Sequence, residues 1–366
     1  MSNEKSYKDI IAFHPGSYVE DIIEDLNITQ REFAERLGVT PKTITLLIQG
    51  KERISTNLAD KLARLTGISM QTWINLQASY DAKCIEIDNL QKRDAEIAVC
   101  SQIDFLYFKK NGIVENRRYS MDDKLKTLRE HMKLSDLTML RSFNNSVSYR
   151  NTREFSEKSV INSNVMLELA TDVSRNATEN KYDSRKLEEA FPAIKNMSLE
   201  TPDIFYPRLK EILLNCGIVL VGLPNMKGAN LNGATRRFKN GSVMLLITDR
   251  NKNADIFWFT LIHELGHIYN NDFYSDYKNK EKYLEKERAA DEFARTFYID
   301  NNSYHEFTSR NEFNSESITA FAENLHISPD ILIGRLQHDH KISYSDFNYM
   351  KRKYTFRLSY TSHQSD

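Results

Sequence analysis

The sequence has few of the features that mark an exported or membrane-bound protein. Only three cysteines occur in 366 residues, and they lie far apart at Cys84, Cys100 and Cys216. They are too few and too scattered for a disulfide framework or a thiolate metal site, and an odd number suits a reducing compartment. No terminal apolar stretch approaches the length of a signal peptide or a membrane span. We therefore expect a cytoplasmic protein that makes no membrane contact.

Two histidines four residues apart lie in an apolar, helix-compatible run. His263 and His267 would leave the same face of a helix about 6 Å apart, close enough to hold one metal ion, and zinc (Zn²⁺) suits the pair. Glu264 lies between them and can take a proton from water at the open coordination position, as in the H-E-x-x-H arrangement of metalloproteases. The alternative is an amphipathic core helix whose two histidines have ordinary partners.

A third metal ligand is expected in a second helix downstream. Residues 287–297 have an apolar stripe at helical spacing, and Glu287 falls on that stripe. A carboxylate there would face the first helix, and burying its charge is costly unless a cation such as zinc meets it. Asp291, one turn further on, can accept the N–H of a ligating histidine and fix its tautomer. Alternatively, Glu287 is one more solvated glutamate of the charged run 280–288.

The segments HELGH and E-x-x-A-D-x-F-A resemble the ImmA/IrrE family of bacterial zinc metallopeptidases. The likeness runs from roughly residue 130 to 350 and includes the segments that flank both motifs. It implies a zinc-dependent peptidase with both histidines as ligands, Glu264 as general base and Glu287 as third ligand. One departure is visible, because family members often place a further histidine just after HELGH, where this chain has Asn-Asn-Asp at 270–272.

Residues 27–49 predict two short helices joined by a tight turn. Thr29 is an N-cap candidate with Glu32 three residues later, Gly38 supplies the turn, and Pro41 suits a first helical turn. The apolar residues of both helices form a shared core, so polar residues remain at the start and outer face of the second helix, where a helix-turn-helix reads the major groove. The residues expected to contact DNA are Thr40, Lys42, Thr43 and Thr45 in this helix, followed by Lys51 and Arg53 near a phosphate.

The distribution of charged residues supports a DNA-binding surface only in part of this segment. Through residue 80 there are nine Lys or Arg and ten Asp or Glu, so the segment as a whole is not basic. Between Arg36 and Arg64, however, six basic residues stand against two acidic ones, and four acids gather between Glu20 and Asp25 on a helix that could face away from DNA. The alternative is a helical dimerisation module that has no affinity for DNA.

Residues 10–85 resemble HigA-type antitoxins of the Xre class of repressors. The likeness is carried by the H-P-G-S-Y segment, the two helices above, G-K-E-R-I-S and the two following helical segments. It implies binding to a double-stranded DNA operator as a homodimer and, in true antitoxins, the blocking of a toxin.

The length of the chain predicts two or three units, each large enough for its own core. We expect a mainly α protein with a small β-sheet, in which a helix-turn-helix bundle precedes a zincin-like α+β metallopeptidase domain. The predicted boundaries are 1–85 for the DNA-binding domain, 86–200 for a helical connector with the start of the catalytic unit, and 201–366 for the peptidase domain. The C-terminal end could touch nucleic acid or an acidic partner through scattered basic residues, which usually serve only solubility: Lys341, Lys351, Arg352, Lys353 and Arg357.

Together these features predict a DNA-binding regulator fused to a zinc-dependent endopeptidase. The resemblances suggest that the substrate is a repressor or antitoxin-like protein, and the fusion points to this chain's own N-terminal part or an operon partner. Two alternatives remain open: a non-catalytic antitoxin or transcription factor that uses the zincin fold as a scaffold, and a regulator whose middle helices bind a small molecule.

Overall fold

The protein is described from a computed structural model, which describes residues 4–142, 156–273 and 280–358. The chain divides into two compact units, residues 1–97 and 98–366. Helices predominate in both, with a two-stranded sheet in the first unit and a three-stranded sheet in the second. The prediction of a mainly helical protein with a small sheet is therefore confirmed.

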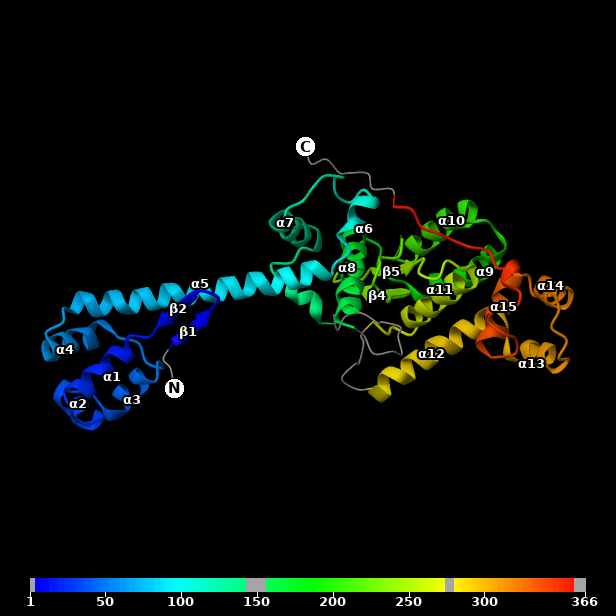
Figure 1. The fold of residues 1–366 in the computed structure, drawn as a ribbon. Helices are drawn as coiled ribbons and strands as arrows, with labels where there is room; N and C mark the ends of the chain where they lie inside the picture. Colours follow the sequence, from blue (N-terminus) through cyan, green and yellow to red (C-terminus); the bar gives the residue numbers. More distant parts are fainter. Residues whose placement is uncertain (1–3, 143–155, 274–279, 359–366) are drawn as a thin grey trace. The chain divides into compact units, whose positions relative to one another are not determined.

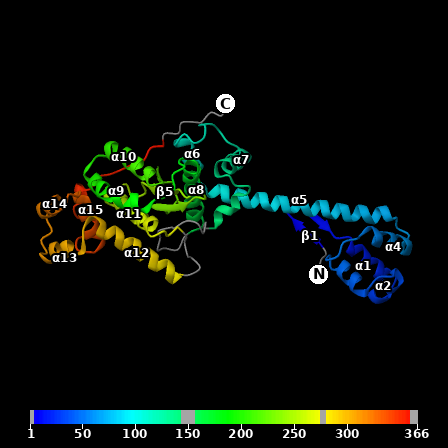
Figure 2. The same ribbon diagram turned by 180° about the vertical axis from the view of Figure 1, so that it is seen from behind.

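The first unit consists of a β-hairpin and a helical bundle (Figure 1). Its elements are β1 (Glu4–Tyr7), β2 (Ile10–Phe13), α1 (Gly16–Asp25), α2 (Gln30–Leu37), α3 (Pro41–Ile48), α4 (Thr56–Thr66) and α5 (Met70–Gln102), whose last residues belong to the second unit. The hairpin lies beside α5, as the view from behind also shows (Figure 2), and Lys5 forms an ion pair with Asp88 of that helix. The bundle core contains Phe33, Leu37, Ile44, Leu47 and Trp73, all buried.

Local sequence determines the two helices of the helix-turn-helix. Thr29 accepts a hydrogen bond from the backbone N–H of Glu32, and α2 ends at Gly38 with φ of 66°, a left-handed conformation that favours glycine. α3 begins at Pro41, and the side chain of its N-cap Thr40 accepts a hydrogen bond from the Thr43 N–H. The predicted helix, turn and helix are confirmed to within a residue. The Glu32 carboxylate pairs with Arg36.

The second unit has a small mixed sheet between helices. Its earlier elements are α6 (Phe105–Lys110), α7 (Met121–Met132), η1 (Leu137–Arg141), α8 (Glu157–Ser174), α9 (Ser184–Asn196), η2 (Met197–Leu199) and α10 (Pro202–Asn215). They are followed by β3 (Ile218–Leu223), β4 (Gly233–Arg237), β5 (Val243–Thr248), α11 (Ala254–Tyr269), α12 (Lys280–Tyr298), α13 (Asn301–Ser309), α14 (Ser315–Asn324), α15 (Pro329–His338) and η3 (Asn348–Met350).

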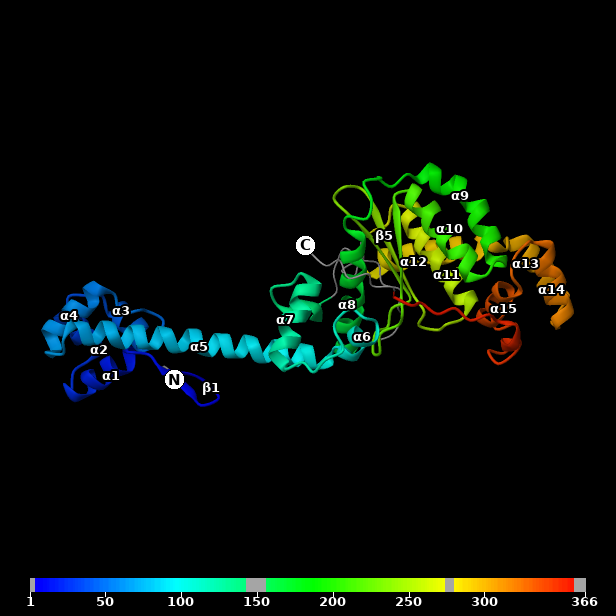
Figure 3. The ribbon, with the colours of Figure 1, turned by 90° about the horizontal axis from the view of Figure 1, so that it is seen from above.

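The sheet has the strand order β3-β5-β4, with β3 parallel and β4 antiparallel to the central strand β5. Every residue of β5 is buried, because α8 packs on one face of the sheet and α11 on the other (Figure 3). α12 lies along α11, and the two helices make one of the largest packing contacts of the unit. The sheet thereby holds α11 in the interior, where nearly all its residues are buried.

The C-terminal segment is fixed to the start of α11. Lys351 and Asp255 form a buried ion pair of 2.7 Å, and Arg352 lies 2.8 Å from the buried carboxylate of Asp330. The backbone N–H of Ala254 donates to the Arg352 carbonyl, which caps the first turn of the helix. The expectation that the basic residues of this end serve mainly solubility is therefore wrong for Lys351 and Arg352, because both are bound to carboxylates of the core.

The domain boundaries expected at residues 85 and 200 remain a prediction; α5 continues through the first of them, and η2 ends one residue before the second. Within the described ranges, none of the helices combines the length and the apolar character needed to cross a bilayer.

Candidate metal centre and nucleic-acid interface

α11 presents its two histidines to the same point. Nε2 of His263 and Nε2 of His267 lie 3.1 Å apart, and both side chains are almost fully buried. The i, i+4 spacing produces this convergence, because one helical turn separates the residues. The predicted pair is thus brought together.

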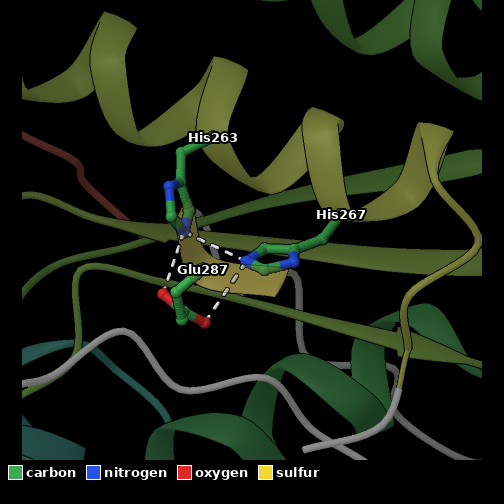
Figure 4. Close-up of side chains that lie close together, drawn as sticks. All are labelled: His263, His267 and Glu287. Atoms are coloured by element: carbon green, nitrogen blue, oxygen red, sulfur yellow. Dashed lines mark hydrogen bonds and ion pairs between the residues drawn. The ribbon is translucent and has the colours of Figure 1, made fainter. Parts of the chain in front are cut away.

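α12 adds a carboxylate to the pair. Glu287 Oε2 lies 3.5 Å from Nε2 of His263, and its Oε1 lies 3.4 Å from Nε2 of His267 (Figure 4). The three potential ligand atoms lie within 4.8 Å of one another, a spacing in which one metal ion could be held. The Glu287 side chain is only 13% exposed, so the solvated alternative does not describe this residue.

Each histidine also contacts a carboxylate through its other ring nitrogen. Nδ1 of His263 lies 2.9 Å from Oδ1 of Asp291, the residue expected to contact a ligating histidine, although these two atoms do not have hydrogen-bond geometry. Nδ1 of His267 lies 3.3 Å from Oδ2 of Asp272, whose other oxygen pairs with Lys286 on α12. A carboxylate in this position fixes the ring orientation and the tautomer that leaves Nε2 available to a metal.

Asp272 was not predicted as a site residue. It belongs to the Asn-Asn-Asp segment in which the chain departs from the ImmA/IrrE pattern. Asn271 has φ of 54°, and this left-handed turn brings the Asp272 N–H within 2.8 Å of the His267 carbonyl. An asparagine just after an apolar helix is a signal for such a turn, and it could have placed the next carboxylate near the helix end.

Glu264 is buried against the edge strand β4. A side chain at Gly233 would place its Cβ 2.8 Å from both Cγ and Oε1 of Glu264, and 2.9 Å from Cγ2 of Thr260. The glycine therefore lets the glutamate lie directly against the strand backbone, where its carboxylate is held beside the histidines of the same helix.

Opposite charges stabilise two of the metal-site side chains, His267 and Glu287. Burial lowers the pKa of His267, but hydrogen bonds with Asp272 and Glu287 raise it by more, to about 10. Burial raises the pKa of Glu287, but its contacts with His263 and His267 lower it to about 2. A cation placed among these groups would replace the proton that His267 holds.

The expected DNA-contacting residues lie on the exposed side of the helix-turn-helix. Lys42 and Thr45 are exposed in α3, while Thr43 is half-buried. Thr45 donates to the Pro41 carbonyl at 3.1 Å and lies 3.3 Å from Oε1 of Gln30, so Gln30 of α2 joins this surface without having been predicted. Its position at the start of the first helix of the motif was the sequence signal that could have identified Gln30 as part of this surface.

The cations of this surface differ in their partners. Arg53 pairs with Asp81 of α5, and Lys61 donates to the Gly38 carbonyl. Within the described ranges, neither Lys42 nor Lys51 has a carboxylate partner. These two lysines are therefore the cations with most freedom to meet a phosphate.

Comparisons with known proteins match two parts of the chain. The helix-turn-helix family model matches residues 19–73, and the peptidase U49 family model matches residues 255–322. The chain is 30% identical over 82 residues to the uncharacterized HTH-type transcriptional regulator YddM of Escherichia coli, a match that covers 21% of this chain and 87% of that protein. It is 29% identical over 89 residues to virulence-associated protein I of Dichelobacter nodosus, covering 24% and 82%.

Two solved structures each match less than a quarter of the chain. One is a putative antidote protein of a plasmid maintenance system from Nostoc punctiforme, with 33% identity, 22% of this chain and 90% of that chain covered, and a TM-score of 0.22. The other is an addiction module antidote protein of the HigA family from Coxiella burnetii, with 26% identity, 23% and 94% covered, and the same TM-score. Both resemblances expected from the sequence are confirmed, and the chain belongs to the helix-turn-helix transcriptional regulators through its N-terminal unit and carries a peptidase U49 domain in its C-terminal unit.

Proposed function

We propose that the C-terminal unit is a zinc-dependent endopeptidase of the HExxH type. In this proposal His263, His267 and Glu287 hold the ion, Asp291 orients His263, and Glu264 is the general base. The convergence of two imidazole nitrogens and one carboxylate within 4.8 Å carries the proposal, together with the peptidase family match over the same segment.

The donor set suits zinc. Catalytic zinc sites commonly take three nitrogen, oxygen or sulfur ligands from the protein and keep a fourth position open, and two histidines with a glutamate are such a set. The bound ion would polarise the scissile carbonyl and make water acidic enough to supply a nucleophile. The hydrogen bond between Nδ1 of His267 and Asp272 favours the tautomer in which Nε2 is the free donor atom, and Asp291 lies close enough to Nδ1 of His263 to act on that ring in the same way.

Glu264 would transfer a proton from the attacking water to the leaving amine. Its carboxylate, next to both histidines in α11, would accept a proton from the attacking water as the new carbon–oxygen bond forms. It would then deliver that proton to the leaving amine nitrogen when the peptide bond breaks. Gly233 leaves room for the carboxylate, and the burial of Glu264 keeps bulk water from competing for it.

We propose that the N-terminal unit binds a double-stranded DNA operator through α3 and the loop that follows it. Thr43, Thr45 and Lys42 would face base edges or phosphates, with Thr40 at the start of the helix. Lys51 and Arg53 would contact the backbone, Arg53 by exchanging Asp81 for a phosphate. Because such motifs bind paired half-sites, we expect a homodimer.

The fusion suggests what the peptidase acts on. We propose that this protein acts in the cytoplasm and that its substrate is a repressor or antitoxin-like protein, with this chain's own N-terminal unit as one candidate. The resemblance to HigA-type antitoxins also supports a cognate toxin as a partner of the N-terminal unit.

The test compares wild type with Glu264→Gln as full chains. Each is incubated with zinc, alone and with proteins encoded beside it, and products are identified by intact-mass spectrometry. We expect new peptides with wild type only, because glutamine keeps the shape of the side chain but cannot accept the proton. If neither wild type nor Glu264→Gln yields a cleavage product, and both repress transcription fully in a parallel reporter assay, the zincin fold would instead have a scaffold role.

A further inference from the structure

A hollow in the C-terminal unit lies away from the metal-site residues. It has a volume of about 490 Å³, and its lining includes Lys110 at the end of α6, Pro224 just after β3, and Phe356 and Arg357 of the C-terminal segment. None of its lining residues belongs to the metal centre. Because Pro224 directly follows β3, and β3 and β5 end side by side, the hollow lies at the carboxyl ends of these parallel strands. Ligand sites are common at this position in sheets of this kind.

Both charged residues that line the hollow are cations. Over the ranges that the structure describes, Lys110 and Arg357 have no ion pair or hydrogen bond from their charged groups. The carboxylate of Asp249 is nearby, but its two oxygens accept backbone hydrogen bonds, from the Asn225 N–H at 2.7 Å and the Phe356 N–H at 2.9 Å, and it forms no ion pair with Lys110 or Arg357 within the described residues. Two unpaired positive charges at one hollow favour an anion.

The hollow has apolar walls, and the segments that form them are held by hydrogen bonds. Pro224, Phe356 and Leu358 supply the apolar surface. The Tyr107 hydroxyl donates to the Pro224 carbonyl at 2.9 Å, which ties α6 to the loop after β3. The Tyr354 N–H donates to the Lys252 carbonyl at 2.7 Å, which ties the C-terminal segment to the start of α11. These bonds place the walls before any ligand arrives.

We propose that this hollow binds a small organic phosphate, with its phosphate between Lys110 and Arg357 and its apolar body against Phe356 and Pro224. A dianion matches two cations, and the volume suits a single small molecule. Because Phe356 and Arg357 continue from the segment that caps α11, the ligand would stabilise the attachment of this segment to the helix that carries His263. The site does not depend on peptidase activity.

The test measures binding of phenyl phosphate to the full chain by isothermal titration calorimetry. We expect saturable binding with one site in the C-terminal unit, tighter than for inorganic phosphate and absent for benzyl alcohol. Lys110→Gln and Arg357→Gln should each weaken binding roughly tenfold or more, because each loses a charged hydrogen bond.

Two matched controls keep this result specific. Lys126→Gln removes an exposed lysine of α7 outside the hollow, and Lys92→Gln removes an exposed lysine of α5; both should bind phenyl phosphate as wild type does. Hydrogen exchange supplies a second measurement, in which phenyl phosphate should slow exchange of the Tyr354 and Phe356 amides. Undetectable binding by wild type, or equal weakening by Lys126→Gln or Lys92→Gln, would overturn the proposal.

Discussion

Oδ2 of Asp272 lies 3.3 Å from Nδ1 of His267, while Oδ1 of the same carboxylate pairs with Lys286, the residue before Glu287. One side chain thus connects a histidine of α11 with the segment of α12 that supplies the third potential ligand. If the site holds zinc, Asp272 positions His267 by fixing its ring and its tautomer.

Replacing Asp272 should therefore weaken metal binding without removing a ligand. Asp272→Ala is expected to lower zinc affinity by about 10- to 100-fold, the range observed when the partner of a ligating histidine is lost. Competition with a chromophoric chelator measures this affinity. Lys286→Gln is the matched control, since it breaks the ion pair but keeps the carboxylate, and its affinity should fall less. An unchanged affinity in Asp272→Ala would show that His267 is oriented by other contacts.

Zinc binding should release protons. The pKa of His267 is raised to about 10 by the balance of burial against Asp272 and Glu287, so the ring is protonated at neutral pH before an ion enters. A ligating imidazole must be neutral, so about one proton should leave His267 for each zinc bound below pH 10. Titration calorimetry in buffers of different ionisation enthalpy counts these protons. A count near zero at pH 7 would contradict the protonated state.

The stability of the metal-free, chelator-treated protein should fall as pH rises above neutrality. Because the pKa of His267 lies above its ordinary 6.5, its contribution to stability is fully present below pH 6.5 and is lost as pH rises toward 10. The pKa of Glu287 lies below its ordinary 4.5, so its contribution is present above pH 4.5 and is lost as pH falls toward 2. The thermal midpoint of the C-terminal unit should accordingly decline above pH 6.5, and less so in Glu287→Gln.

A side chain at Gly233 should impair the proposed base selectively. In Gly233→Ala the new Cβ would stand 2.8 Å from Cγ and Oε1 of Glu264, so the carboxylate must move. A displacement of about 1 Å can cost on the order of 100-fold in rate. Peptidase assays and zinc content should show lost turnover with the metal retained. Ala234→Gly, the adjacent change on the same strand, should keep most activity; equal losses in both variants would point to damage of the strand.

Operator binding should depend on the two lysines without carboxylate partners. Lys42→Gln and Lys51→Gln should each reduce the salt dependence of DNA binding by about 0.9 in the slope of log K against log salt, provided that each lysine neutralises one phosphate. Arg64→Gln is the control, because Arg64 is already paired with Asp60 at 2.9 Å. Fluorescence anisotropy at several salt concentrations gives the slopes, and identical slopes for all three variants would argue against these contacts.

Sequence patterns predicted the parts of the protein that depend on near neighbours. Thr29, Gly38 and Pro41 act through their own backbone, so the helix-turn-helix could be placed to within a residue. The two histidines likewise follow from helical spacing, and Glu287 follows from a carboxylate on an apolar stripe.

The features that were missed depend on tertiary contacts. Asp272 reaches His267 only because the chain turns back at Asn271. Lys351 meets Asp255 across 96 residues of sequence, and no local pattern distinguishes it from a solvated lysine. The same holds for Gly233, whose role appears only when β4 lies against α11.

The most direct test of the account is the metal content of the purified full chain. Inductively coupled plasma mass spectrometry should find about one zinc per wild-type chain, and much less in His263→Ala, His267→Ala and Glu287→Ala, because each removes one of three ligands. Glu264→Gln should retain zinc as wild type does. Zinc content near zero in zinc-treated wild type, or unchanged in the three ligand variants, would contradict a metal centre at this site.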